Sequence, residues 1–200
     1  MNKHYTNTDN PIDFPKDKIT EFLDKYAKQI EGMSDEEWEN LGKSMLKHKK
    51  GNLLDLAEAG EFDVVVQGCN CFNTMGGGIA REIRERYPAA ALFDNETEKG
   101  DYNKLGNYTL VYPEFTNGKF LIVNAYTQYN MSQGTDVFEY VAFELILQKL
   151  IHAYGDKRIG LPYIGMGLAG GNAGIILDMI AEFAYSVASK GGSVTLVEFG

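Results

Sequence analysis

Residues 63–80 read DVVVQGCNCFNTMGGGIA, and this stretch largely decides which fold the chain adopts. The valines at 64–66 form a short β-branched apolar run, which is typical of a strand buried on both faces of a sheet. The glycines at 76–78 then open a helical pattern that extends from Gly78 to Arg86 and stops at Pro88. Backbone N–H groups at such glycines can approach an anion closely, and the helix adds the positive end of its dipole. The stretch therefore predicts a buried strand that leads through an anion-binding loop into a helix.

A second glycine cluster, GLPYIGMGLAGG at residues 160–171, also joins a predicted strand (158–162) to a predicted helix (174–188). In α/β sheets, ligands bind beyond the carboxyl ends of the strands, where loops enter helices. We interpret the two clusters as loops on either side of a diphosphate, the alternative being tight turns without a ligand. Neither cluster contains the Gly-Lys-Ser/Thr of a P-loop, and the match of the second cluster to the Gly-x-Gly-x-x-Gly dinucleotide fingerprint is weak.

The remaining pattern alternates between strands and helices. Strands are predicted over 108–112 and 120–126, separated by an Asn117-Gly118 turn, and over 193–198. A long apolar helix is predicted over 137–151. This alternation predicts an α/β sandwich with a largely parallel sheet.

Composition limits the function. The 200 residues are 44% hydrophobic and carry a net charge of −9, which suits one main domain and argues against general nucleic-acid binding. No apolar run reaches the roughly 20 residues of a membrane helix, and no leader pattern is visible. The two cysteines, Cys69 and Cys71, are too few for a disulfide framework. We therefore expect a cytoplasmic protein without membrane attachment.

The first fifty residues differ in character, because they hold only Gly32 and Gly42 of the 22 glycines. The apolar spacing from Ile19 to Ile30 predicts one helix, and a capping box at Ser34 and Glu37 predicts a second helix with an apolar stripe at Trp38, Leu41 and Met45. Two such helices cannot bury a core alone. We expect residues 1–49 to form a helical extension docked on a main domain at 50–200, or else on a partner.

Several of these stretches, together with NAYTQ at residues 124–128, resemble the macrodomain family over about residues 50–199. Within the family they are most similar to the branch of ADP-ribose-1″-phosphate phosphatases and terminal ADP-ribose glycohydrolases. The resemblance implies a three-layer α/β/α sandwich with a mixed, largely parallel sheet that binds ADP-ribose at the carboxyl edge of the sheet.

The resemblance also implies a set of binding residues. Asn52 stands where the family places an aspartate that accepts from the adenine amino group, and Gln67 and Asn70 match two amide positions, with Asn70 facing the distal ribose. The alternatives are that Asn52 is a turn residue, that Asn70 only ties its own loop, and that Ile79 and Ile164 pack in the core. The ligand-binding residues implied are Asn52, Leu53, Gln67, Asn70, Met75, Gly76, Gly77, Gly78, Ile79, Thr127, Ile164, Gly165, Met166, Gly167, Leu168, Ala169 and Gly170.

Catalytic residues are less evident. The positions of the glycohydrolase lysine and aspartate align with Ala125 and Ala169, so lysine-dependent chemistry is not expected. The cysteines are interpreted as buried small side chains, and no metal or cofactor is expected. Four carboxylates that border the site in sequence are interpreted as solvated charges: Asp94, Glu96, Asp101 and Asp136.

Catalysis would therefore depend on positioning, with Asn70, Asn124 and Gln128 orienting a water and loop N–H groups stabilising negative charge. This hypothesis predicts slow hydrolysis of ADP-ribose-1″-phosphate or a related ADP-ribosyl ester, because amides are poor general bases. The alternatives are a non-catalytic reader that sequesters ADP-ribose, and a hydrolase that removes ADP-ribose from protein or nucleic acid.

Overall fold

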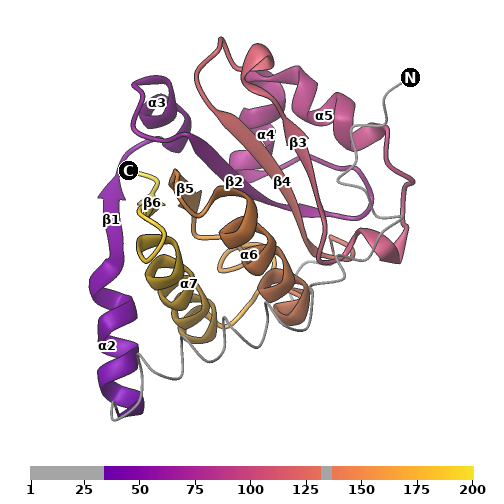
Figure 1. Ribbon diagram of the computed structural model, residues 1–200. Coiled ribbons are helices and arrows are strands. Elements are labelled where there is room, and N and C mark those ends of the chain that lie inside the picture. Colours follow the sequence, from indigo (N-terminus) through magenta and orange to yellow (C-terminus); the bar gives the residue numbers. More distant parts are fainter. Residues whose placement is uncertain (1–33, 132–136) are drawn as a thin grey trace.

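The computed structural model describes residues 34–131 and 137–200, so the helix predicted between Ile19 and Ile30 lies outside the described residues. The described part forms a six-stranded sheet in the order β1-β6-β5-β2-β4-β3 (Figure 1). All neighbouring strands are parallel except β3, which pairs antiparallel with β4. The strands are β1 (Leu46–Lys50), β2 (Val64–Asn70), β3 (Tyr108–Val111), β4 (Leu121–Gln128), β5 (Arg158–Pro162) and β6 (Ser193–Glu198).

Helices cover both faces of this sheet, so the predicted three-layer sandwich is confirmed (Figure 1). One face packs against α6 and α7, and the other packs against α3, α4 and α5. The helices are α2 (Asp35–Met45), α3 (Leu53–Glu58), α4 (Gly78–Arg86), α5 (Pro88–Asn95), α6 (Tyr140–Tyr154) and α7 (Ala173–Ala188), with short 3₁₀ turns η1 (Tyr102–Lys104) and η2 (Pro113–Phe115). Among the described helices, none is long and apolar enough to cross a membrane.

Strand β2 shows why the valine run folds as predicted. Val64 and Val66 belong to the apolar cluster on the α6/α7 side, whereas Val65 and Cys69 belong to the cluster on the α3/α4/α5 side. Because successive side chains of a strand point to opposite faces, only a strand covered on both faces buries such a continuous run.

The N-terminal segment departs from the predicted domain boundary. The capping box is present, since Ser34 N–H donates to a Glu37 carboxylate oxygen at 2.8 Å and Glu37 N–H donates to Ser34 Oγ at 3.2 Å. Helix α2 then packs against α7 at Gly42, where an added Cβ would lie 3.1 Å from Ala181 O. It leads directly into β1, which pairs with β6. The boundary predicted after residue 49 therefore falls inside a strand of the main sheet.

Sequence patterns missed β1 because it is an edge strand. In LKHKK only Leu46 is buried, and the other four residues are exposed, so no alternation marks the strand. Lysines on an exposed edge discourage pairing with another chain. Helix α5 was missed for a different reason: Pro88 does end α4, but it also occupies the first turn of α5, where its missing N–H has no cost.

A buried polar pair joins the centre of the sheet. Gln67 of β2 and Asn124 of β4 are register partners with 0% exposure, and Gln67 Nε2 donates to Asn124 Oδ1 at 2.7 Å. Asn124 Nδ2 donates to Ala90 O and to Thr109 Oγ1, each at 3.0 Å. Asn124 thus ties β4 to α5 and β3, and its amide is used inside the core and does not reach the surface, where a water beside a ligand would lie.

The substitution Asn124→Ala should destabilise the protein by about 1–3 kcal/mol, because it leaves buried partners of the amide unsatisfied. Urea denaturation monitored by circular dichroism measures this free energy of unfolding. The control is Asn103→Ala, which removes an exposed amide bonded to Asp101 and should change stability by less than about 0.5 kcal/mol. Equal effects of the two substitutions would contradict the core role of Asn124.

Candidate functional site

Two loops meet at one edge of the sheet. Loop 1 (residues 71–77) connects β2 to α4, and loop 2 (residues 163–172) connects β5 to α7. Strands β2 and β5 are parallel neighbours, so both loops leave from the carboxyl edge of the sheet. The loops also touch, since a Cβ added to Gly77 would lie 3.3 Å from Leu168 Cδ1.

Both loops present backbone donors. Within the described residues, no hydrogen-bond acceptor is found for the N–H groups of Gly76, Gly77 and Gly78, and all three glycines are exposed. Gly77 is the N-cap of α4 and supplies no capping side chain. In loop 2, the N–H groups of Gly167 and Leu168 likewise have no hydrogen-bond acceptor within the described residues, and both residues are exposed. Unpaired N–H groups at a helix start form a site for an anion.

The shape of loop 2 is fixed by close packing. Gly165 has a φ of +78°, and an added Cβ would lie 2.4 Å from the ring of Phe138, so only glycine fits there. Gly171 N–H donates to Gly165 O at 2.9 Å, and Gly170 N–H donates to Gly167 O at 3.0 Å. These bonds hold the loop in one compact conformation.

Asn70, at the end of β2, closes loop 1 from within. Its Oδ1 accepts from Phe72 N–H and from Thr74 Oγ1, and its Nδ2 donates to Thr74 O, each at 2.9 Å. Its exposure is 6%. This geometry matches the alternative interpretation that Asn70 ties its own loop.

Asn52 likewise serves local structure. It is the N-cap of α3, and its Oδ1 accepts from Leu54 N–H at 2.8 Å and from Asp55 N–H at 3.1 Å. Its Nδ2 donates to Glu82 Oε1 at 2.8 Å. Both lone pairs of the side-chain oxygen are used, which matches the alternative interpretation that Asn52 serves local structure.

Apolar and polar residues at the base of the loops pack in the interior. Ile164 and Thr127 are buried, and both would lie 3.0 Å from a Cβ added to Gly68. Ile164 belongs to the core cluster on the α6/α7 side and half-buried Ile79 packs against the other cluster, in line with the alternative interpretation of these two residues. Of the other residues implied by the resemblance, Leu53, Gln67, Met75 and Ala169 are buried, and Met166 and Gln128 are half-buried.

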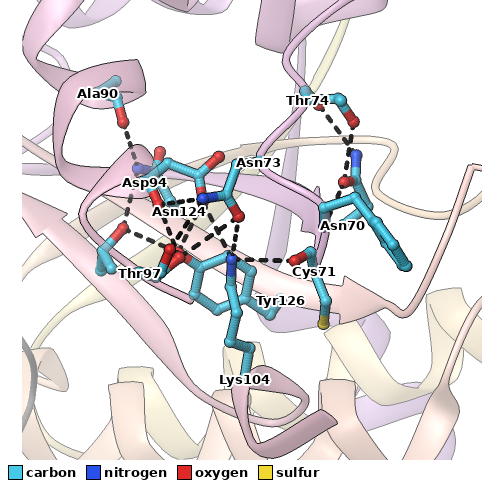
Figure 2. A network of polar contacts seen from close by, with 12 residues as sticks. Asn70, Cys71, Asn73, Thr74, Ala90, Asp94, Thr97, Lys104, Asn124 and Tyr126 are labelled. Atoms are coloured by element: carbon cyan, nitrogen blue, oxygen red, sulfur yellow. Dashed lines mark hydrogen bonds and ion pairs between the residues drawn. The ribbon is translucent and has the colours of Figure 1, made fainter. Parts of the chain in front are cut away.

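A charged network, which the sequence did not indicate, lies beneath loop 1 (Figure 2). Lys104 is 6% exposed and Asp94 is 1% exposed, and Lys104 Nζ lies 3.6 Å from Asp94 Oδ1. Nζ also donates to Cys71 O at 3.2 Å and lies 4.4 Å from the centroid of the Tyr126 ring. The interpretation of Asp94 as a solvated charge is therefore wrong, and no local pattern distinguishes Lys104 from a surface lysine.

Burial shifts the titration of these groups. Desolvation raises the pKa of Asp94, while a hydrogen bond from Tyr126 at 2.8 Å and the Lys104 charge oppose this shift. Desolvation lowers the pKa of Lys104, and Asp94 opposes that shift. Burial also raises the pKa of Cys69 and brings that of Cys71 to about 11, so both thiols stay protonated near neutral pH. The interpretation of the cysteines as buried small side chains is confirmed.

Comparison with known proteins identifies relatives. No family model matches the sequence. An uncharacterized 17.5 kDa protein from the tk-vs intergenic region of Enterobacteria phage T4 is 33% identical over 146 residues, which are 70% of this chain and 90% of the phage protein.

Solved structures share the architecture. The macrodomain of Mycobacterium tuberculosis DarG matches with a TM-score of 0.60 and 18% identity, over 76% of this chain and 96% of that one. Thermosipho africanus DarTG, solved in complex with ADP-ribose, matches with a TM-score of 0.59 and 14% identity, over 77% of this chain and 42% of that one. The chain therefore has the macrodomain fold and belongs to the same family as the phage T4 protein.

Proposed function

We propose that the protein binds ADP-ribose, with the diphosphate held between loop 1 and loop 2. The observation that carries this proposal is that, within residues 34–131 and 137–200, N–H groups without a hydrogen-bond acceptor lie on two touching glycine loops at the ends of adjacent parallel strands. The Thermosipho africanus protein of the same fold, which was solved with ADP-ribose, supports the choice of ligand.

Charge is consistent with this mode of binding. Loops 1 and 2 contain neither lysine nor arginine, and the whole chain carries a net charge of −9. In this proposal the diphosphate is held by backbone dipoles of the two loops, together with the N-terminus of the nine-residue helix α4. Binding of this kind does not attract other polyanions to the surface, which supports the expectation that general nucleic-acid binding is absent.

Hydrolysis of ADP-ribose-1″-phosphate, or of a related ADP-ribosyl ester, is the finer proposal. Gln128 ends β4 beside Asn70 of β2, and its Nε2 donates to Asn130 O at 2.7 Å. Among the described residues no partner is found for Gln128 Oε1, which leaves this oxygen able to orient a water. Loop N–H groups would stabilise the negative charge that develops during attack.

The competing proposal is a reader that binds ADP-ribose without turnover. It is favoured by the internal use of Asn70 and Asn124, because neither amide reaches toward the exposed glycines. A third possible activity is the removal of ADP-ribose from a modified protein or nucleic acid, which can be measured with the same purified variants.

Gly77 offers a sharp test of binding. Its φ of −141° accommodates any residue, and a side chain there points toward Leu168 between the loops. Gly77→Glu should weaken ADP-ribose binding about tenfold or more, equivalent to about 1.4 kcal/mol, through repulsion of the diphosphate. The isosteric Gly77→Gln should weaken it less, because it adds the same bulk without charge.

Isothermal titration calorimetry measures these affinities, and thermal melting checks that each variant is folded. Absence of ADP-ribose binding by the wild-type protein would contradict the proposed function. Equal affinities of the two variants would show that the charge at residue 77 does not face the diphosphate.

Phosphate release from ADP-ribose-1″-phosphate tests hydrolysis. Gln128→Ala should slow release by about tenfold without changing affinity, because it removes a group that orients the water and not one that binds the diphosphate. Tight binding without release by the wild-type protein would support the reader. Release that persists in Gly77→Glu would indicate a contaminating phosphatase.

A further inference from the structure

Loop 1 reverses the chain between β2 and the three glycines, and this reversal depends on Asn73. Asn73 has a φ of +57°, and among the described residues only Asn117 is a second non-glycine residue in the left-handed region. Asn70 closes the turn from inside through Phe72 and Thr74. The turn therefore determines where the chain enters the run of exposed glycines.

The side chain of Asn73 is anchored below the loop (Figure 2). Its Nδ2 donates to Asp94 O at 2.9 Å and to Thr97 O at 3.1 Å, and its Oδ1 accepts from Lys104 Nζ. Lys104 Nζ also donates to Cys71 O at 3.2 Å. Lys104 thus holds loop 1 on both sides of Phe72.

The ammonium group of Lys104 is buried for a reason beyond pairing with Asp94. A buried ion pair is often no more stabilising than apolar residues of the same volume, because both charges lose their hydration. Here the ammonium donates to a backbone carbonyl and to a side-chain amide of loop 1, and charge-assisted hydrogen bonds of this kind are strong and directional. The network therefore fixes the conformation of the loop.

We propose that Lys104 is a positioning residue for ligand binding: it holds loop 1 so that the N–H groups of Gly76, Gly77 and Gly78 face the diphosphate. The inference rests on the proposed function, because it assigns those N–H groups to that ligand. Lys104 itself does not touch the ligand, being 6% exposed beneath the turn.

Three variants separate positioning from stability. Lys104→Met removes the ammonium but leaves Asp94 buried without its counter-charge, so a loss of stability is expected. Lys104→Met combined with Asp94→Asn removes both charges and keeps an acceptor for Tyr126. The matched control is Lys149→Met, because Lys149 is half-buried and donates to Gly106 O and to Asn107 Oδ1, neither of which belongs to loop 1 or loop 2.

Calorimetry with ADP-ribose and thermal melting should give distinct patterns. Lys104→Met should lower both the melting temperature and the affinity, the affinity by about tenfold or more. The double variant should regain melting temperature without regaining affinity, because Asn73 Oδ1 and Cys71 O still lack the Lys104 ammonium, and their remaining donors, Thr97 Oγ1 at 3.4 Å and Gly100 N–H at 2.8 Å, carry no charge. Lys149→Met should lower only the melting temperature. Recovery of affinity in the double variant would overturn the proposal, as would wild-type affinity in Lys104→Met.

Amide hydrogen exchange gives a readout that does not depend on binding. Exchange at residues 73–78 should accelerate in the double variant and stay unchanged in Lys149→Met. Unchanged exchange in the double variant would overturn the positioning role. The wild-type protein could bind no ADP-ribose while exchange still accelerates in the double variant. In that case the proposed function fails, together with the assignment of the loop N–H groups to a diphosphate. The anchoring of loop 1 by Lys104 would then stand on its own.

Discussion

Parallel pairing of β2 with both β4 and β5 is the constraint on which the candidate site depends. Pairing of this kind brings the carboxyl ends of all three strands to one edge of the sheet, and the loops that follow β2 and β5 touch there through Gly77 and Leu168. The pairing is possible because helices bury both faces of β2. Loop 2 then keeps its shape through Gly165, which lies against Phe138 where a Cβ would not fit.

Amide side chains near this edge of the sheet form hydrogen bonds within the protein, some of them in the core and some of them in the loops. Gln67 and Asn124 form a buried cross-link between β2 and β4, Asn70 closes loop 1, and Asn52 caps α3. Asn70 and Asn124 bond to groups in the interior or at its border, Asn52 bonds to the first turn of α3, and among the described residues Gln67 Oε1 is buried without a partner. In the proposed binding mode an anion is held by backbone N–H groups, whose direction depends on the conformation of the loops.

Buried charge supports that conformation from below. Lys104 and Asp94 pair between α5, β4 and loop 1, where burial acts against both ionised forms and their mutual attraction favours them. An acidic protein thus places one of its 19 lysine and arginine residues beneath the loop and not at the surface of the site. The loops themselves carry no cationic side chain. An anion bound there would contact backbone N–H groups directly, and the Lys104 ammonium would act on it only from beneath loop 1.

Features that depend on neighbouring residues can be predicted from the amino-acid sequence alone. The valines at 64–66 predict a strand covered on both faces, the two glycine clusters predict the loops in which Gly78, Gly165 and Gly170 have a positive φ, and Ser34 with Glu37 predicts the start of α2. Tertiary structure alone decided that LKHKK becomes an edge strand, that Asp94 and Lys104 are buried together, and that Asn52 and Asn124 bond internally. The physical reason is that periodicity and backbone conformation are properties of neighbouring residues, whereas the environment of a single polar side chain depends on the elements that pack around it.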